Sequence, residues 1–441
     1  MIDMTVAKVA DAVCGKLHNG GAELPVSGAV RDNREVAPGL MFCALPGARF
    51  DGHDFIKAAL DAGAPCCLGC RVPEGAAGPV ITVPDVASAM ARLAAVCRKK
   101  TTAPVVGITG SSGKTTAKEM CARVLSRKFN TLKTEKNYNN ELGVPLTIFR
   151  IMPETEAAVI ELGISDFGEM SRLGEMARPD IAVYTLIGRS HLEALGDRRG
   201  VLRAKTELLD FMPDNGLVVV NGDDDLLSEL GCRQRKLSFG LGIRCDVRAE
   251  DYRCMGAKGS AFTIVGGGRR IETEVTAYGR HMVYAALAAA AVGMELGVSD
   301  SEIAEGIAGY EPVGRRASIV DTGLITIIDD CYNANPDSTQ MAISSASDLG
   351  GRLVCILGDM LELGDRSEEF HRETGRKALE TGAVLLTAGS LSSVMGGEHF
   401  KSKAELIEAL PDRIRKGDRV LVKASHSMAF EEITEALKRL R

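Results

Sequence analysis

The sequence predicts an α/β protein with three domains: a small N-terminal α/β domain, a central domain built on a parallel sheet, and a C-terminal Rossmann-like domain. Its 441 residues are about three times the length of a typical domain. Apolar runs of strand length alternate with helical segments over the last three quarters of the chain, which is typical of a parallel sheet covered by helices. The 48 glycines agree with a chain that makes many strand-to-helix turns.

Changes in pattern place the domain boundaries near residues 100 and 314. Residues 1–100 mix short strands and helices and end in a helical stretch over residues 86–100. The sequence Thr-Thr-Ala-Pro at residues 101–104 then precedes a buried strand. We therefore expect an N-terminal domain over residues 1–100, a central domain over residues 101–314 and a C-terminal domain over residues 315–441.

The central and C-terminal blocks repeat the same alternation. Within the central block, the polar residues 246–276 predict short antiparallel strands, with a turn at the three glycines 266–268. The alanine-rich residues 282–296 predict a buried helix. The other strands that we expect are residues 105–108, 157–160, 181–187 and 217–220 in the central block, and residues 324–328, 353–357, 384–387 and 420–422 in the last.

Composition excludes several classes of function. A net charge of −6 gives no basic surface for a nucleic acid, so we expect no nucleic-acid partner. The longest apolar run, residues 282–294, is shorter than the roughly 18 residues of a membrane span. Twelve cysteines without a secretory signal are typical of reduced thiols in the cytoplasm, and the group Cys66, Cys67 and Cys70 is interpreted as a buried strand because no second ligand pair matches it. We expect a soluble cytoplasmic protein that does not insert into membranes.

The strongest local pattern is VVGITGSSGKTT at residues 105–116. Gly110 and Gly113 would let the backbone approach a polyphosphate, and consecutive N–H groups at the start of a helix over residues 114–128 would face its charge. Lys114 would reach the terminal phosphates and Thr115 would bind Mg²⁺. The usual phosphate-binding pattern has glycine where this chain has Ile108, so the glycine spacing departs from that pattern.

Three other side chains follow strands of the same block. Glu161 ends an expected strand, where its carboxylate could reach a magnesium ion; the alternative is an ordinary surface glutamate. His191 and Lys205 follow the next strand, and their chemistry alone leaves a structural histidine and a solvated lysine equally open.

A set of motifs along nearly the whole chain resembles the Mur ligases, the ATP-dependent amide ligases that build the cell-wall peptide. The same wide glycine spacing in the phosphate loop is typical of that family. The other similar segments are RDNREVAPGLMFCALPGARFDGHDFI, KNYNNELGVPLT, ELG at Glu161, SHLEALGD, AKTEL, GRH, VGR, DDCYNANPDS and LGDMLELG. The N-terminal domain is similar to a UDP-sugar-binding domain, and the central one to the family's ATPase domain.

Within the family, the last two motifs are most similar to the members that add D-alanyl-D-alanine to UDP-N-acetylmuramoyl-tripeptide. The resemblance implies that the tripeptide carboxylate is phosphorylated by ATP and that the dipeptide amine attacks the acyl phosphate, in a protein that acts as a monomer. Two alternatives stay open: a related Mur or folylpolyglutamate-type ligase with another substrate, and a nucleotide-binding protein that has lost turnover.

The resemblance also implies roles for individual residues. Two Mg²⁺ ions are implied, one on Thr115 and Glu161 and one on Glu161, His191 and a carbamylated Lys205. The catalytic set is Lys114, Glu161, His191, Lys205 and Arg315. The implied ATP-binding residues are Gly110, Ser111, Ser112, Gly113, Lys114, Thr115, Thr116, His281, Arg315, Asp330, Asn333 and Asn335. The implied substrate-binding residues are Arg34, the loop 47–54 with Gly47 and Asp51, and Asn137, Asn139, Asn140 and His426.

Four positions depart from the family pattern. Met282 and Tyr284 replace two asparagines after the histidine of the GRH motif, and Leu186 replaces an asparagine near the second metal. His426 replaces an arginine that would hold the dipeptide carboxylate, and it would do so more weakly and with a dependence on pH. For Asn137, Asn139 and Asn140, a turn made by residues that tolerate left-handed backbone is the alternative to substrate contact.

Overall fold

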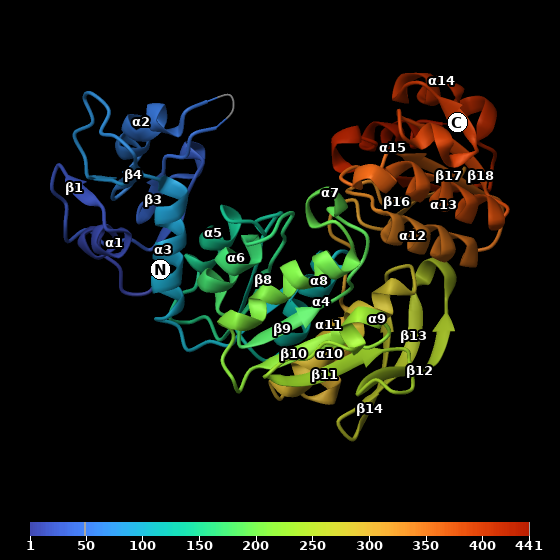
Figure 1. The fold of residues 1–441 in the computed structure, drawn as a ribbon, viewed down its shortest axis with the longest axis horizontal. Helices are drawn as coiled ribbons and strands as arrows, with labels where there is room; N and C mark the ends of the chain where they lie inside the picture. Colours follow the sequence, from blue (N-terminus) through green and yellow to red (C-terminus); the bar gives the residue numbers. More distant parts are fainter. Residues whose placement is uncertain (48–49, 441) are drawn as a thin grey trace.

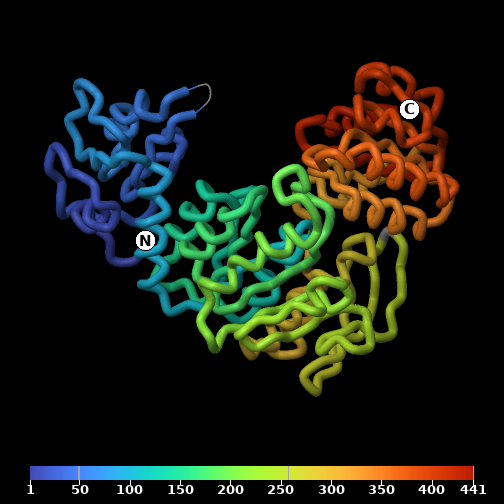
Figure 2. Tube along the Cα trace, viewed as in Figure 1, coloured from blue at the N-terminus to red at the C-terminus, as the bar shows by residue number. Residues whose placement is uncertain are grey.

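The computed structural model describes residues 1–47 and 50–440 and arranges them as an arc of three lobes (Figure 1). The N-terminal lobe is blue, the central lobe runs from teal to yellow, and the C-terminal lobe is orange and red. The same view as a tube places the N-terminus where the blue and teal lobes meet (Figure 2). There the Met1 amino group donates to the Phe149 carbonyl at 2.8 Å, so the first residue fastens the two lobes together.

The N-terminal lobe is a five-stranded sheet in the order β1-β5-β4-β3-β2, parallel except for the β1–β5 pair. Cys66 and Cys67 are buried at β4 as expected of a strand, whereas Cys70 follows β4 and is exposed. All twelve cysteines are free thiols. Its elements are α1 (Val6–Val13), β1 (Lys16–His18), β2 (Gly28–Val30), β3 (Leu40–Cys43), α2 (Ile56–Asp61), β4 (Cys67–Gly69), β5 (Val80–Thr82) and α3 (Val86–Arg98).

The central lobe has a nine-stranded sheet in the order β14-β13-β12-β11-β10-β9-β6-β8-β7. The neighbouring strands from β12 across β11, β10, β9, β6 and β8 to β7 pair in parallel. At the other edge, β12, β13 and β14 form the expected antiparallel strands. The elements are β6 (Val105–Thr109), α4 (Lys114–Leu125), β7 (Thr131–Lys133), α5 (Gly143–Ile148), β8 (Ala157–Glu161), α6 (Glu169–Ala177), β9 (Ile181–Tyr184), α7 (Leu192–Leu195), α8 (Arg198–Thr206), β10 (Leu217–Asn221), α9 (Asp225–Ser228), β11 (Arg235–Gly240), β12 (Val247–Cys254), β13 (Ser260–Gly266), β14 (Arg269–Val275), α10 (His281–Glu295) and α11 (Asp300–Ala308).

The C-terminal lobe is a six-stranded sheet in the order β15-β16-β20-β17-β18-β19, parallel except for the β15–β16 hairpin. The predicted Rossmann-like alternation is therefore confirmed, with edge strands that the sequence analysis did not anticipate. The elements are β15 (Ser318–Asp321), β16 (Thr326–Asp329), α12 (Pro336–Asp348), β17 (Leu353–Gly358), η5 (Gly364–Arg366), α13 (Ser367–Glu380), β18 (Val384–Ala388), β19 (Glu398–Phe400), α14 (Lys403–Arg413), β20 (Arg419–Lys423), η7 (His426–Met428) and α15 (Glu431–Leu437).

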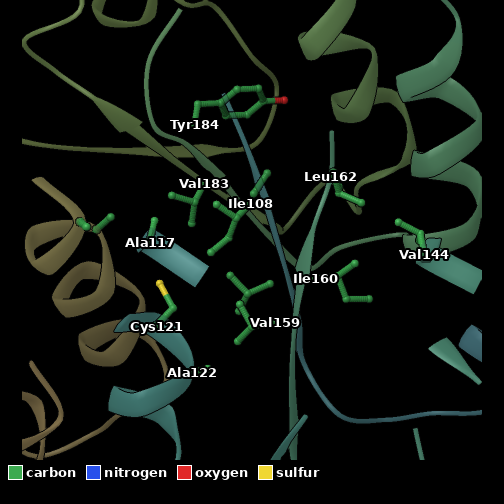
Figure 3. Close-up of a cluster of buried hydrophobic side chains, with 14 of the residues drawn as sticks. Ile108, Ala117, Cys121, Ala122, Val144, Val159, Ile160, Leu162, Val183 and Tyr184 are labelled. Carbon is green, nitrogen blue, oxygen red and sulfur yellow. The ribbon is translucent and has the colours of Figure 1, made fainter. Parts of the chain in front are cut away.

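Helix α4 packs on the centre of the large sheet, and this packing fixes the loop that precedes it. Figure 3 shows Ala117 and Cys121 of α4 beside Ile108 of β6, Val159 of β8 and Val183 of β9. All five are fully buried. Each Å² of apolar surface buried at this interface stabilises the packing of α4 on the sheet by about 25 cal/mol. The packed helix in turn fixes the position of the phosphate loop that precedes it.

Two differences from the expected elements have local causes. The strand expected over 181–187 ends at Tyr184, because the next backbone groups turn to the phosphate loop: Ser111 N–H donates to the Leu186 carbonyl at 2.7 Å. The strand expected to start at residue 324 starts at Thr326, after a turn in which Ile325 N–H donates to the Thr322 hydroxyl at 3.1 Å. Among the described residues, no helix is both long and apolar enough to cross a membrane.

Candidate active site

The phosphate loop lies between the end of β6 and the start of α4, as the sequence predicts. Gly110 has φ +149°, and a Cβ there would lie 2.0 Å from the Thr185 hydroxyl oxygen. Gly113, with φ +80°, precedes α4 and carries no side chain to cap it. The Thr185 hydroxyl donates to the Ser112 carbonyl at 2.5 Å, which holds the loop against the end of β9. The first N–H groups of α4 are therefore available to an anion.

Lys114 is the cation of this loop. Its Nζ donates to the Gly110 carbonyl at 2.7 Å, so the side chain folds back over the loop. Burial lowers the pKa of Lys114; the negative charge of Glu161 opposes that shift and the positive charge of Arg316 adds to it. A phosphate beside Lys114 would restore the pKa of its ammonium, since a nearby negative charge favours the protonated form.

Glu161 forms an oxygen-rich centre with the loop. It ends β8, is only 2% exposed, and accepts hydrogen bonds from the Thr115 hydroxyl at 3.0 Å and from the Asn139 amide at 2.9 Å. A buried carboxylate beside a hydroxyl and an amide fits Mg²⁺, which takes oxygen ligands. The surface-glutamate alternative is wrong for this residue, because the carboxylate is buried against the loop.

His191 and Lys205 lie in the segment that follows β9, His191 at the start of α7 and Lys205 in α8. Lys205 is 1% exposed, and no described carboxylate lies within ion-pair distance of its Nζ. Burial, and next the charge of Lys114, hold the pKa of Lys205 well below its usual value, while Glu169 opposes the shift. The solvated-lysine alternative is therefore wrong.

His191 adopts left-handed backbone, with φ +55°, at the start of α7. Its Nδ1 lies 2.5 Å from a carboxylate oxygen of Glu362 in the C-terminal lobe. Burial lowers the pKa of His191, and the charge of Glu362 opposes this shift. In the part of the chain that the structure describes, no three His, Cys, Asp or Glu side chains converge on one metal position, so the second metal stays a prediction.

A cavity of about 590 Å³ opens between the central and C-terminal lobes. It is lined by most of the predicted ATP-binding and catalytic residues, but not by Gly110, Lys205 or Arg315. From the central lobe it is lined by Ser111, Ser112, Gly113, Lys114, Thr115, Thr116, Asn139, Asn140, Glu161, His191 and His281, and from the C-terminal lobe by Asp330, Asn333 and Asn335.

The C-terminal wall of this cavity follows the ends of β16 and β20. Asp330 accepts from the Lys423 ammonium at 2.5 Å and from the Ala317 backbone N–H at 3.1 Å. Lys423, 3% exposed, also donates to the Asn333 carbonyl at 2.9 Å. Asn335 caps α12 by accepting from the Ser338 N–H at 2.8 Å. This wall is thus a rigid set of polar groups, and Lys423 is a member that sequence reasoning missed.

The segment after the GRH motif lines the other end of the cavity. Tyr284, one of the departures from the family pattern, donates its hydroxyl hydrogen to Asp223 at 2.9 Å, and both residues line the cavity. Met282 is buried and also lines it. The Nδ1 atom of His281 is buried and has no hydrogen-bond partner among the described residues, and burial lowers the pKa of this histidine.

Arg315 does not line the cavity. Its guanidinium is engaged within the C-terminal lobe, at 2.8 Å from Asp329 and 3.2 Å from Glu435. The neighbouring Arg316 lines the cavity instead. The two adjacent arginines thus have different surroundings, and the sequence shows the pair without showing which one faces the cavity. The role predicted for Arg315 stays a prediction.

The predicted substrate-binding residues of the N-terminal lobe do not line the cavity. Arg34 is exposed and pairs with Asp32 at 2.6 Å. Asp51 binds His53 at 2.5 Å and Arg71 at 3.0 Å, so its carboxylate braces its own loop. Gly47 begins that loop, of which residues 48 and 49 lie outside the described residues.

The asparagines after β7 divide between the two interpretations. Asn139 lines the cavity and binds Glu161. Asn140 also lines it, but its side-chain oxygen accepts from the Gly143 N–H at 3.0 Å, which is the turn alternative. Asn137 is exposed and outside the cavity lining. His426 is exposed on η7, with its ring 5.4 Å from that of Tyr332.

Comparison with known proteins decides the family. Residues 26–98 match the Mur ligase family catalytic domain, residues 108–293 the Mur ligase middle domain, and residues 315–426 the Mur ligase glutamate ligase domain. The UDP-N-acetylmuramoyl-tripeptide--D-alanyl-D-alanine ligase of Bacillus subtilis is 36% identical, over 99% of both chains. The chain belongs to the Mur ligase family.

Solved Mur ligases have the same architecture. The crystal structure of MurF from Acinetobacter baumannii matches with a TM-score of 0.90 at 30% identity and covers 98% of both chains. MurF from Thermotoga maritima, solved with ADP, matches with a TM-score of 0.83 at 29% identity, over 93% of this chain and 97% of that one. The three sheets of the present chain are therefore the three Mur ligase domains, which confirms the predicted fold class.

Proposed function

We propose that this Mur ligase joins D-alanyl-D-alanine to UDP-N-acetylmuramoyl-tripeptide with hydrolysis of ATP to ADP and phosphate, in peptidoglycan precursor synthesis. The observation that carries the proposal is the full-length likeness to ligases of that name, together with the phosphate loop that opens into a cavity between two lobes. The two alternative readings have less support. The relatives found at full length share one substrate name, and the buried polar centre around Glu161 is intact.

The first step must bring two anions together. A carboxylate oxygen of the tripeptide attacks the γ-phosphorus of ATP, the bond to the bridging oxygen breaks, and ADP leaves. Positive charge and alignment are what the site has to provide. Lys114 and the N–H groups at the start of α4 meet the phosphates, and the end of β8 brings Glu161 to the same place.

The second step is the attack of the dipeptide amine on the acyl carbon. The nitrogen forms the amide bond with the acyl carbon, and the bond between that carbon and the phosphate oxygen breaks, so that phosphate leaves. The amine loses its extra proton. Water would destroy the acyl phosphate before this step. The cavity walls come from two lobes, so we infer that closure of the C-terminal lobe both assembles the site and excludes water.

Thr115 and Glu161 would hold Mg²⁺, which supplies charge compensation for the phosphates when bound. A second ion on Glu161, His191 and a carbamylated Lys205 belongs to the same proposal. Its support is the burial of Lys205, since a neutral amine is the form that attacks CO₂ and becomes an anionic carbamate with loss of a proton. We also propose that the protein is a cytoplasmic monomer.

The test is phosphate release by the purified protein with ATP, Mg²⁺ and the tripeptide nucleotide, with and without D-alanyl-D-alanine. We expect release that depends on the dipeptide and equals the amount of pentapeptide nucleotide formed. Release that ignores the dipeptide, or that requires glutamate instead, would contradict this proposal and favour one of the related ligases.

A further inference from the structure

Lys118 is a buried lysine of helix α4 that has no part in the proposed reaction so far. It is 1% exposed, its Nζ lies 2.8 Å from a carboxylate oxygen of Glu119, and Glu119 also binds Lys133. Burial raises the pKa of Glu119, but hydrogen bonds from the two lysines outweigh that effect and leave the pKa below its usual value. Buried ion pairs are often no more stabilising than apolar side chains of the same volume. The contacts that this ion cluster makes with its surroundings therefore indicate its role.

The Lys118 ammonium also reaches the end of an edge strand. Its Nζ donates to the Thr134 carbonyl at 2.8 Å. Thr134 is fully buried and directly follows β7, which has three residues and lies at the edge of the nine-stranded sheet beside β8. An edge strand pairs on one side only, so a strand this short has few ladder bonds to fix its end. Lys118 supplies a charge-assisted hydrogen bond at that point.

Thr134 in turn contacts the backbone of Glu161. Its hydroxyl oxygen accepts from the Glu161 N–H at 3.0 Å. The Glu161 carboxylate accepts from the Thr115 hydroxyl at 3.0 Å, and Thr115 lies three residues before Lys118, on the same face of α4. These contacts close a ring that leaves α4 at Lys118 and returns to it at Thr115. The ring contains both residues that would hold the first Mg²⁺.

We propose that Lys118 is a positioning residue that, through Thr134, holds Glu161 in place beside Thr115 for binding of Mg²⁺ with the nucleotide. The proposal rests on the proposed function for the identity of the ion and of the nucleotide. Neither Lys118 nor Thr134 lines the cavity, which agrees with action through another residue. Groups that orient a metal ligand without touching the metal change metal affinity by about 10- to 100-fold when they are removed.

The test measures how far Mg²⁺ strengthens nucleotide binding in the absence of peptide substrates. Wild type, Lys118→Met, Lys118→Arg and Thr134→Val are titrated by calorimetry with a non-hydrolysable β,γ-methylene ATP analogue, once with Mg²⁺ and once with EDTA. Methionine lacks the ammonium of lysine, and valine has the shape of threonine without its hydroxyl. We expect Lys118→Met and Thr134→Val to weaken binding about tenfold with Mg²⁺ and less than about twofold with EDTA. Lys118→Arg keeps a charged donor and should recover part of the loss.

The double variant Lys118→Met/Thr134→Val tests whether the two residues act through one chain of contacts. If they do, the second substitution removes a link from a ring that the first has already opened. The loss in the double variant should then be close to that in either single variant. Independent effects would multiply to about a hundredfold, and that result would overturn the proposal.

Lys128→Met is the matched control, because Lys128 is exposed and its Nζ also donates to a backbone carbonyl, that of Gly297, at 2.7 Å. It should bind the analogue as wild type does under both conditions. Equal losses with Mg²⁺ and with EDTA in Lys118→Met would indicate that the ion cluster only stabilises the fold, and would contradict the proposal. Unchanged binding in Lys118→Met, or a wild type whose binding is indifferent to Mg²⁺, would contradict it as well.

Failure of this proposal and failure of the proposed function can be told apart, because binding is measured without the peptide substrates. A wild type that binds the analogue more tightly with Mg²⁺ but shows no dipeptide-dependent phosphate release would contradict the proposed function alone. The role of Lys118 would still be decided by its own titrations. Thermal unfolding of each variant checks that the fold is retained. Thr134→Val leaves the ion cluster intact and keeps the test valid if Lys118→Met is unstable.

Discussion

At the scale of single residues, Lys205 is a buried lysine that does not line the cavity and has no described carboxylate within ion-pair distance. Lys205 lies 1% exposed near Lys114, an arrangement that an unmodified ammonium would destabilise by charge repulsion. A carbamate on Lys205 would turn the repulsion into attraction for Lys114 and for a magnesium ion. The residue is therefore the most direct test of the proposed metal site.

We expect Lys205→Ala to lose about 10- to 100-fold in turnover, as loss of a group that tunes a metal site does. Incubation of wild type with ¹³C-bicarbonate should give a carbamate signal in the ¹³C NMR spectrum, and this signal should be absent in Lys205→Ala. The exposed Lys416→Ala is the control, with full activity and the signal retained. Normal turnover in Lys205→Ala would rule out this role.

His371 is a second buried residue whose protonation state the contacts define. Its Nδ1–H donates to the Ser367 carbonyl at 2.7 Å, and its Nε2 accepts from the Met360 N–H at 2.9 Å, so the neutral ring is the form that fits. Burial, the larger cause, lowers the pKa of His371. Protonation would place two N–H groups against each other at Met360, just before Glu362.

The sign of the pH effect follows from that lowered pKa. The unfolded chain takes up the proton at higher pH than the folded protein does, so stability is lost as pH falls from about 6.5 toward the folded-state pKa. We expect the Tm of wild type to fall more between pH 7.5 and pH 5.5 than that of His371→Gln. An equal fall in both proteins would show that this histidine does not contribute.

At the scale of elements, the loop between β6 and α4 carries the clearest steric constraint. A Cβ on Gly110 would lie 2.0 Å from the Thr185 hydroxyl oxygen, and the residue has φ +149°. We expect Gly110→Ala to weaken nucleotide binding at least about tenfold, because the loop must move away from β9. Gly231→Ala is the control, since nothing lies within 4 Å of its added Cβ, and it should bind as wild type. Nucleotide titration checks both.

The same loop shows what sequence alone can predict. The strand β6, helix α4 and the lysine between them follow from local pattern, because apolar runs, glycines and the Lys-Thr pair act within a few residues of each other. Glu161 at the end of β8 was also predictable, since parallel strands end at one edge of a sheet. The short edge strands β15 and β19 were not, because pairing with a neighbour rather than their own composition defines them.

The orientation of adjacent arginines also lay beyond sequence reasoning. Arg315 and Arg316 have the same chemistry, and only the positions of Asp329 and Tyr332 decide which one pairs internally and which one faces the cavity. The contact of His191 with Glu362 depends in the same way on how two lobes meet. The His191–Glu362 contact joins residues more than a hundred positions apart, and no local pattern contains it.

At the scale of the whole molecule, one arginine ties the central lobe to the C-terminal lobe. Arg189, just after β9, binds Asp337 of α12 at 2.9 Å and Glu373 of α13 at 2.7 Å, and its guanidinium carbon lies 5.1 Å from the centre of the Phe370 ring. Figure 1 shows α12 on the side of the C-terminal lobe that faces the central lobe. Arg189 therefore contributes to the relative position of the two cavity walls.

We expect Arg189→Ala to raise the KM for ATP several-fold and to widen the interlobe distance distribution measured between spin labels on α9 and α14. Partly buried, hydrogen-bonded charges stabilise a contact between lobes more than exposed ion pairs do. The effect should therefore exceed that of Arg199→Ala, because Arg199 is exposed and has no described ion pair. Identical distance distributions in the two variants would contradict the role of Arg189.

The central claim is that this cavity makes an acyl phosphate from the tripeptide carboxylate. The tripeptide nucleotide labelled with ¹⁸O in its terminal carboxylate tests it directly, with mass spectrometry of the phosphate released during ligation to D-alanyl-D-alanine. The account predicts one ¹⁸O atom in each phosphate, because the carboxylate oxygen that attacks the γ-phosphorus leaves with it. Phosphate without ¹⁸O from labelled substrate, with its new oxygen coming from water, would contradict the account.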